Sequence, residues 1–363
     1  MFRPQPFVSI IILNYNGERY LDDCIASVLK NDYQNFELLL VDNASTDLSV
    51  KNALQAFGSD TRLRLVQSEE NLGFSGGNNL GFNHAKGDLI VFLNNDTVVD
   101  SQWLIHLVNA LETDDSIGLA QSNILMIDGQ TIQTAGWLYS DYLVQKYGLA
   151  ENKNSNLKLK PIFEVSAASG ASMITRRRLI EQIGLFDPTI PFFYDDTLLS
   201  FKVWLANKRV VTVSNSKIRH IQGATSAWNL KRTTYNLLKA KICLMFDVYY
   251  EINDLAKGAL VNVFSIAVNS LFFLRKKNLA VIFANVEALL WSLKNFRYLW
   301  QNRLSHWAKT EMSPKKLQEK FVRIRLPLPL YLVPSKLGIS RYTFEAWKYE
   351  SSLTYPDAAN QRV

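Results

Sequence analysis

The chain has 363 residues and a formal net charge of +7, with 48% hydrophobic and 20% charged residues. This composition excludes a disordered or collagen-like chain and supplies enough apolar material for one large domain or two ordinary ones. The charge is uneven: residues 1–228 contain 19 Lys and Arg against 24 Asp and Glu, and residues 229–363 contain 21 against 9. We therefore expect two regions, an acidic one at 1–228 and a basic one at 229–363. Since the positive excess lies wholly in the second region, the high isoelectric point by itself does not indicate nucleic-acid binding.

The first half of the chain alternates strand and helix patterns. Short apolar runs at 7–13 and 36–41 predict buried strands, and residues 62–66 and 88–93 read as two further strands. The helices predicted to connect or flank them are at 17–30, 48–57 and 76–85. Strands that alternate with helices form right-handed βαβ crossovers, so we expect an α/β fold with a mainly parallel sheet flanked by helices. Ligands of such sheets bind beyond the carboxyl ends of the strands.

Polar segments follow three of these predicted strands, at residues 14–16, 42–47 and 94–96. Parallel strands bring their carboxyl ends to one edge of the sheet, so the pattern predicts a site for a polar ligand there. Further along, 175–183 reads as a helix that contains Arg176, Arg177 and Arg178. These arginines could line a basic pocket, but a helical setting favours a solvated surface with salt bridges.

The last third is mostly helical in pattern and contains two apolar stretches. Residues 258–274 contain no charged residue, and residues 278–293 contain only Glu287. A membrane span takes about 20 apolar residues, so the first stretch is near the lower limit and the second is below it. Lysines and arginines flank the first stretch, which favours peripheral contact with an anionic membrane surface over helices packed inside the protein or a true span.

Two features of the sequence predict the cellular compartment of the protein. Cys24 and Cys243 are its only cysteines, which is too few for a disulfide framework. The N-terminus runs straight into a strand pattern without the apolar region of a signal peptide. We therefore expect a cytoplasmic protein, at the inner face of the cell membrane if the apolar stretches contact lipid.

Four segments, in order, resemble the family-2 glycosyltransferases of the GT-A fold, and among them the bacterial rhamnosyltransferase-like branch. The segments are VSIIILNYNGERYLDDCIASVL with FELLLVDNASTD, ENLGFSGGNNLGFNHAKGDLIVFLNNDTVV, SGASMITRRRLIEQIGLFDPTIPFFYDD and HIQGATS. Together they cover residues 7–228. The resemblance implies a hexosyltransferase that moves a sugar, with inversion, from a UDP- or dTDP-type nucleotide sugar to a saccharide or lipid-linked saccharide. Cell-surface polysaccharide biosynthesis is the expected process.

The resemblance also assigns nucleotide contacts to residues of the first two segments. Asp42 matches the aspartate that binds the base, and its carboxylate can accept a hydrogen bond from a base N–H or a ribose hydroxyl. Tyr15 could stack on the base. The other expected contacts are Asn14, Asn16, Asn71, Gly73, Asn78 and Asn95. The competing interpretation is that these are turn and cap residues, with Gly76 and Gly77 in an ordinary loop that needs positive φ.

Asp96 and His220 are the expected ligands of a divalent metal, Mg²⁺ or Mn²⁺. Such ions bridge a carboxylate to substrate phosphates and stabilise the charge of a leaving diphosphate. Asn94 stands where the family's metal motif has its first aspartate, and an amide brings no charge to the site. The competing interpretations are a solvated turn for Asp96 and a structural role for His220.

Asp195 and Asp196 match the family's catalytic pair. By position Asp196 is the general base, and Asp195 orients the acceptor or the base. Repulsion between adjacent carboxylates could raise one pKa, although either residue could instead cap the following helix. Gly170 and Ala171 match the stretch that lines the donor-sugar pocket.

Two other functions compete with sugar transfer. A sugar-nucleotide nucleotidyltransferase would need a Gly-rich loop with Lys or Arg directly after the first strand, and 14–18 does not supply one. A non-catalytic membrane- or nucleic-acid-binding module would explain only the basic region. We therefore expect a nucleotide-sugar donor, a saccharide acceptor and no nucleic acid as partners, and leave oligomerisation open.

Overall fold

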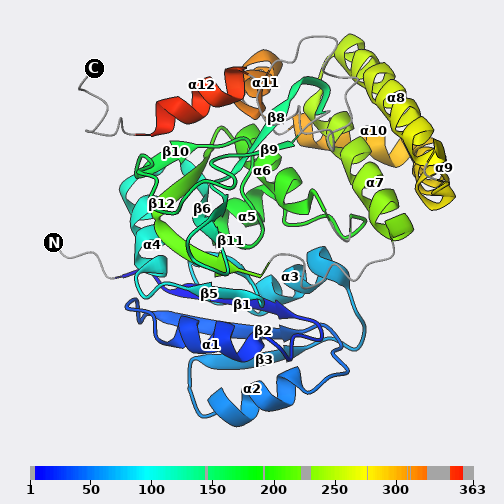
Figure 1. The fold of residues 1–363 in the computed structure, drawn as a ribbon. Coiled ribbons are helices and arrows are strands. Elements are labelled where there is room, and N and C mark those ends of the chain that lie inside the picture. Colours follow the sequence, from blue (N-terminus) through cyan, green and yellow to red (C-terminus); the bar gives the residue numbers. More distant parts are fainter. Residues whose placement is uncertain are drawn as a thin grey trace.

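The computed structural model describes residues 5–143, 146–190, 193–221, 230–275, 277–308, 310, 312–324 and 344–354. A ten-stranded sheet forms its centre, with eight strands in the order β10-β12-β6-β11-β4-β1-β2-β3 and with β5 and β7 paired to β12 and β6 (Figure 1). The strands are β1 (Val8–Asn14), β2 (Phe36–Asp42), β3 (Leu63–Gln67), β4 (Leu89–Asn94), β5 (Thr97–Val99), β6 (Ile117–Met126), β7 (Ile132–Thr134), β10 (Ile162–Glu164), β11 (Ser172–Arg176) and β12 (Arg209–His220).

The four strands predicted from apolar runs form the parallel part of the sheet. β1 pairs in parallel with β2 and β4, and β2 pairs in parallel with β3. Both faces of these strands are covered, because alternate residues enter different cores: Ile11 packs with one cluster and Ile10 and Ile12 with the other. The connecting helices are α1 (Leu21–Leu29), α2 (Ser49–Phe57) and α3 (Gly73–His84), and α4 (Trp103–Thr113) follows β5.

The other half of the sheet is mixed. β11 is antiparallel to both β4 and β6, whereas β12 runs parallel to β6. The predicted helix at 175–183 was therefore too long, since Thr175 and Arg176 end β11 and α5 spans only Arg177–Ile183. Pairing with two neighbouring strands outweighs the local helical pattern at these two residues.

The glycines of α3 allow the helix to approach the sheet closely. A Cβ atom on Gly77 would lie 2.3 Å from Cδ1 of Leu13 in β1. The helix begins at Gly73 and not at Gly76 as predicted, and the competing interpretation of Gly76 and Gly77 as loop residues that need positive φ was wrong. Among the glycines of α3, only Gly73, at the first turn, has a positive φ, of 70°.

A smaller three-stranded sheet, β13-β8-β9, lies beside the main sheet. Its strands are β8 (Trp137–Ser140), β9 (Lys146–Gly148) and β13 (Val322–Ile324), and the turn η1 (Asp141–Leu143) follows β8. Tyr139 of β8 stacks on Phe321, with ring centroids 5.4 Å apart, and Phe321 also packs edge-on against Phe201. The small sheet is thereby fixed against α6 (Asp195–Leu205).

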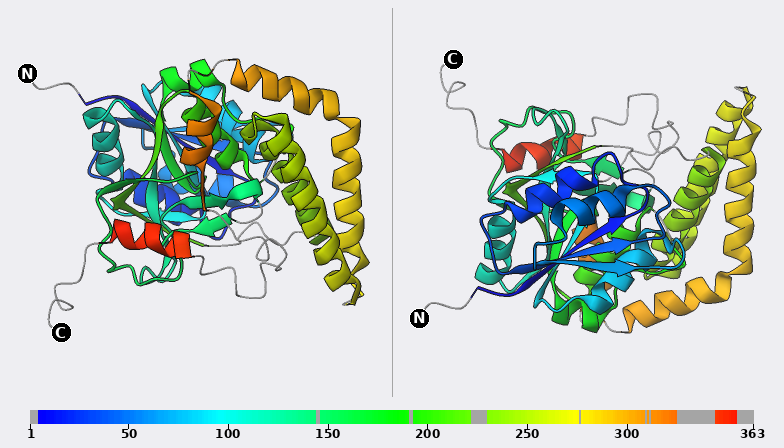
Figure 2. Two further views of the ribbon diagram at one scale, coloured as in Figure 1. Left: turned by 90° about the horizontal axis from the view of Figure 1, so that it is seen from above. Right: turned by 90° about the horizontal axis from the view of Figure 1, so that it is seen from below.

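The C-terminal region is mostly helical, as predicted. Its helices are α7 (Leu230–Val248), α8 (Ile252–Arg275), α9 (Leu279–Lys294), α10 (Phe296–Trp307), α11 (Pro314–Phe321) and α12 (Phe344–Leu353). Leu238, Leu299 and Leu317 belong to the same core cluster as residues of the main sheet, so the C-terminal region packs against the domain that contains this sheet. The predicted boundary at 228/229 lies outside the described residues. Figure 2 shows α8 and α9 at the outer edge of the molecule.

Candidate active site

The polar residues predicted at the strand ends lie together at one edge of the sheet. Asn14 of β1 is in register with Asp42 of β2, and Leu13 is in register with Asn94 of β4. The start of β11 reaches the same edge, since the amide of Asn94 donates to the carbonyl of Ala171 at 3.1 Å. This confirms the prediction that the three polar segments share an edge, and it adds Gly170 and Ala171 to it.

Asp42 is placed to accept a hydrogen bond from a ligand. Its Oδ1 accepts from the amide of Ser45 at 3.0 Å, which fixes the side chain at the end of β2. Its Oδ2 has no partner among the residues that the structure describes. Next to it, Asn43 ties the Gly-rich turn to β2: its Nδ2 donates to Oδ1 of Asn71 at 3.0 Å, and its Oδ1 accepts from the amide of Leu72 at 2.9 Å. Asn71 in turn accepts from the amide of Gly73, and so opens α3.

Asn14 acts inside the protein rather than at its surface. It is 0% exposed, its Nδ2 donates to Ser45 and Ser49 at 3.1 and 2.9 Å, and its Oδ1 accepts from Asn95 at 2.8 Å. The side chain therefore joins the loops after β1, β2 and β4 and positions Asn95. Asn78 is also buried and donates to the carbonyl of Phe74 within α3.

Tyr15 and Asn16 are the accessible members of the first polar segment. Tyr15 is exposed, which leaves its ring free to stack. Asn16 has a positive φ of 54°, and its Oδ1 accepts from the amide of Thr46 at 2.8 Å. The loops after β1 and β2 are thus held together, with Tyr15 and Asp42 on the same edge of the sheet.

The fold brings Asp96 and His220 together although they are far apart in the sequence. β5 pairs antiparallel with β12, and His220 is in register with Thr97. Nε2 of His220 lies 3.1 Å from Oδ1 of Asp96, and its Nδ1 lies 3.0 Å from Oε1 of Gln133. Gln133 comes from β7, and sequence analysis gave no indication of it. Gly223, Thr225 and Ser226, which supported the choice of His220, lie outside the described residues.

The Asp96–His220 pair has the donor atoms that a divalent metal would use. A carboxylate oxygen and an imidazole nitrogen suit Mn²⁺, and the carboxylate suits Mg²⁺. No group of three or more His, Cys, Asp and Glu side chains that could hold a metal occurs in the described part of the chain. The residues present therefore fit a metal that takes its remaining ligands from substrate phosphates and water, as is usual for Mg²⁺.

Asp195 and Asp196 begin α6 next to the same edge. Tyr194, in the left-handed region with a φ of 59°, turns the chain into the helix. Oδ2 of Asp196 accepts from the amide of Gly170 at 3.0 Å, and Oδ1 accepts from the amide of Thr197 at 2.6 Å. Asp196 thus satisfies a helix-end amide, and it also faces the proposed donor-sugar stretch, so both predicted roles are compatible with its position.

The surroundings of the two carboxyl groups shift the pKa of Asp195. Burial and the neighbouring charge of Asp196 raise the pKa of Asp195 to about 8. At neutral pH Asp195 is therefore mostly protonated. Asp196 differs in its contacts, since two backbone amides donate hydrogen bonds to its oxygens.

Lys146 of β9 supplies a positive charge beside this pair. Its Nζ lies 3.9 Å from the ring centroid of Trp137 and 5.6 Å from that of Tyr194. Desolvation lowers the pKa of Lys146, and the charges of Asp196 and Asp195 oppose that shift. Sequence analysis missed this lysine, because only the pairing of β8 with β9 carries it to α6.

The raised pKa of Asp195 makes stability depend on pH. Between about pH 4 and pH 8 the folded protein keeps a proton that the unfolded chain has lost, so this group lowers the free energy of unfolding as pH rises. We expect Asp195→Asn to gain stability relative to the wild type between pH 5 and pH 8, by about 1–2 °C in Tm for each kcal/mol regained. Thermal unfolding at both pH values checks this, with Asp128→Asn, in an exposed turn, as the control. A Tm difference that does not change with pH would mean that Asp195 is ionised throughout.

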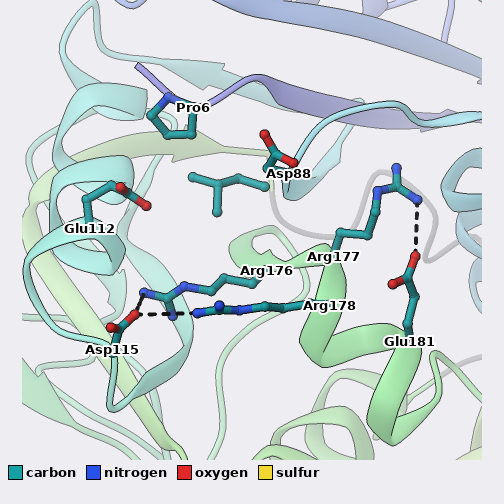
Figure 3. A pocket seen from close by; sticks show the side chains of 9 residues that line it. Pro6, Asp88, Glu112, Asp115, Arg176, Arg177, Arg178 and Glu181 are labelled. Carbon is teal, nitrogen blue, oxygen red and sulfur yellow. Dashed lines mark ion pairs between the residues drawn. The ribbon is translucent and has the colours of Figure 1, made fainter. Parts of the chain in front are cut away.

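The predicted arginine cluster lies at the opposite edge of the sheet. Arg176 is buried and donates from Nη1 to the carbonyl of Ile117 at 2.6 Å, and Arg178 pairs with Asp115 at 3.5 Å. With Asp88, Glu112 and Glu181 they line a cavity of about 440 Å³ (Figure 3). The expectation of a solvated surface was wrong for Arg176, because its guanidinium group is buried and bonds to the backbone at the start of β6. The acidic side chains offset the positive charge of the arginines, and the carboxyl ends of the parallel strands, with their polar segments, lie at the other edge of the sheet. We therefore do not assign catalysis to this cavity.

Comparison with known proteins supports the resemblance. The model of glycosyl transferase family 2 matches residues 9–184. An uncharacterised glycosyltransferase of Haemophilus influenzae is 26% identical over 212 residues, which are 58% of this chain and 62% of that protein. Glycosyltransferase GlyG of Streptococcus pneumoniae is 31% identical over 109 residues, which are 30% of this chain and 36% of GlyG. The chain thus spans less than two thirds of the length of these relatives.

A solved structure shows the same fold. The crystal structure of GalNAc-T7 with UDP, GalNAc and Mn²⁺ aligns with a TM-score of 0.55 at 18% sequence identity, over 68% of this chain and 49% of that chain. At this identity the likeness concerns the fold alone. It confirms the predicted GT-A-type architecture, with a helical C-terminal region added to it.

Proposed function

We propose that this chain, whose residues 9–184 match the model of glycosyl transferase family 2, is an inverting glycosyltransferase. Its donor is a UDP- or dTDP-type nucleotide sugar, and its acceptor is a saccharide or a lipid-linked saccharide of a cell-surface polysaccharide. The observation that carries the proposal is that β11 and α6 bring Asp196, through Gly170, to the edge of the sheet that also holds Asp42 and Asp96.

Each group in this arrangement has a task in the transfer. Asp42 and Tyr15 bind the nucleoside, and Gly170 and Ala171 line the space for the donor sugar. Asp196 takes the proton of the acceptor hydroxyl, whose oxygen bonds to the anomeric carbon while the bond from that carbon to the diphosphate oxygen breaks on the opposite face. Asp195, protonated at neutral pH, can donate a hydrogen bond to the acceptor or to Asp196. When bound, a divalent metal at Asp96 and His220 would neutralise charge on the departing diphosphate.

Neither competing function uses this arrangement. A nucleotidyltransferase needs a Gly-rich loop with cationic side chains after β1, and the loop between β1 and α1 holds Arg19 as its one cation. A non-catalytic module gives no reason for a buried Asp195 carboxyl group with a raised pKa next to Asp196 at this edge of the sheet.

Donor binding is the direct test of the proposal. We expect a UDP- or dTDP-sugar to raise the Tm of the protein, and Mn²⁺ to increase the rise. At a donor concentration 100 times its Kd the stabilisation is about 2.7 kcal/mol. Thermal unfolding with UDP-, dTDP- and GDP-sugars, each with and without Mn²⁺, measures this, and Asp42→Asn should reduce the rise whereas Asp128→Asn should not. No rise with any nucleotide sugar in either condition would contradict the proposal.

A further inference from the structure

Most of the exposed large apolar side chains in the described part of the chain lie on α8, α9 and α10. On α9 they recur every three or four residues, at Leu279, Phe283, Val286, Leu290 and Leu293. On α8, apart from Ile252 at its first position, they are Leu260, Val263, Phe264, Leu271 and Leu274. These ten residues, which we call the hairpin face, form one stripe along each helix, because positions with this spacing share one side of a helix.

The opposite sides of both helices are used for packing. On α9, Val281, Ala284 and Ala288 are buried against the protein, and α9 lies along α7. On α8, Nδ2 of Asn262 donates to the carbonyl of Tyr142 at 2.8 Å. The hairpin face is therefore the outward side of two docked helices, and Figure 2 shows these helices away from the sheet at the rim of the molecule.

Positive charges border the hairpin face at both ends. Arg275 and Lys277 lie at the turn between the helices and are exposed. Lys294 ends α9 and Arg297 lies at the start of α10, while Lys257, which pairs with Asp254 at 4.0 Å, precedes the stripe of α8. Glu287, the one acidic residue of α9, forms an ion pair with Lys231, with Nζ 2.6 Å from Oε1. This border matches anionic headgroups, and it would repel the same border on a second copy of the chain.

We propose that the hairpin face lies flat on an anionic lipid surface, with its apolar side chains between the headgroups and its cations beside the phosphates. By length and composition α8 could cross a membrane, and α9 with α10 could form a second, broken span bent by 68°. A flat position fits better, because the exposed large apolar side chains occupy one side of each helix, whereas a span would expose such side chains to lipid all round.

Contact with a lipid surface would also bring the protein close to a lipid-linked acceptor. This consequence rests on the proposed function. Tyr298 of α10 lies 2.6 Å from the hydroxyl of Thr189, and Lys239 of α7 donates to the carbonyl of Thr189 at 2.7 Å. Residue 189 belongs to the segment that leads from α5 to Asp195. The helices α7 and α10, which contact α9, are thus joined to the segment that precedes Asp195.

Vesicle co-sedimentation of the full chain tests the proposal without any substrate. We expect binding to vesicles of phosphatidylcholine with phosphatidylglycerol, and at least about tenfold weaker binding of the double variant Phe283→Ser, Leu290→Ser, because two large apolar side chains leave the interface. Leu54→Ser with Ile127→Ser removes comparable exposed side chains elsewhere and should leave binding unchanged. Arg275→Gln with Lys277→Gln should abolish the preference over vesicles of phosphatidylcholine alone.

Three outcomes would overturn the proposal. The wild type could fail to bind either kind of vesicle, or the Phe283, Leu290 variant could bind as tightly as the wild type with an unchanged Tm. Light scattering could instead show a wild-type dimer that this variant dissociates, which would assign the hairpin face to a second copy. The donor-induced rise in Tm is measured on the same preparations, so a failure of lipid binding is distinguishable from a failure of the proposed transfer.

Discussion

Asp196→Asn is expected to lower kcat by about two to four orders of magnitude while nucleotide binding is kept, because an amide cannot take the acceptor proton. The side chain keeps its size and one oxygen, so it can still accept from one of the two amides that now fix Asp196. Transfer is measured as release of the nucleoside diphosphate at saturating donor, and donor binding as the rise in Tm.

Asp195→Asn is the matched control, since the two residues are neighbours in α6. At neutral pH Asp195 is protonated, because its pKa is raised to about 8, so an amide resembles its working form. We expect a loss of kcat well below that of Asp196→Asn at pH 7. If the order were reversed, with Asp195→Asn inactive and Asp196→Asn active, the general base would be Asp195.

Asp96→Asn should remove the metal-dependent part of donor binding and lower kcat/KM by about two to three orders of magnitude. Several kcal/mol of charge stabilisation come from a metal at a leaving diphosphate, and each 1.36 kcal/mol is a factor of ten in rate. The amide keeps a polar partner for His220, which lies 3.1 Å from the present carboxylate. The measurement is the rise in Tm with a nucleotide sugar across a Mn²⁺ titration, together with initial rates.

A structural role for the Asp96–His220 pair would give a different pattern. In that case Asp96→Asn would lower the Tm of the ligand-free protein, and the wild type would bind and react equally after metal removal by a chelator. Unchanged donor binding and rate after chelation would therefore exclude the metal assignment, whatever the variant does.

Local patterns in the sequence were sufficient for the parallel half of the sheet and for its polar edge. The apolar runs that became β1, β2 and β4 are buried on both faces, and such runs have few other stable placements. Since the carboxyl ends of neighbouring parallel strands lie at the same edge of a sheet, Asp42 and Asn94 could be placed on one edge from the sequence alone. The apolar stretches at 258–274 and 278–293 likewise became α8 and α9.

Contacts between distant segments decided the rest. No local pattern separates a buried Asn14 from an exposed one, or tells that Gly77 packs on Leu13 instead of shaping a loop. Gln133 and Lys146 reach His220 and the aspartate pair only through the pairing of β6 with β7 and of β8 with β9. The sequence by itself determined which residue types could bind a nucleotide and accept a proton. The tertiary structure decided which of them are buried, which are exposed and which have a shifted pKa, because burial and pKa depend on neighbours that the chain supplies from far away.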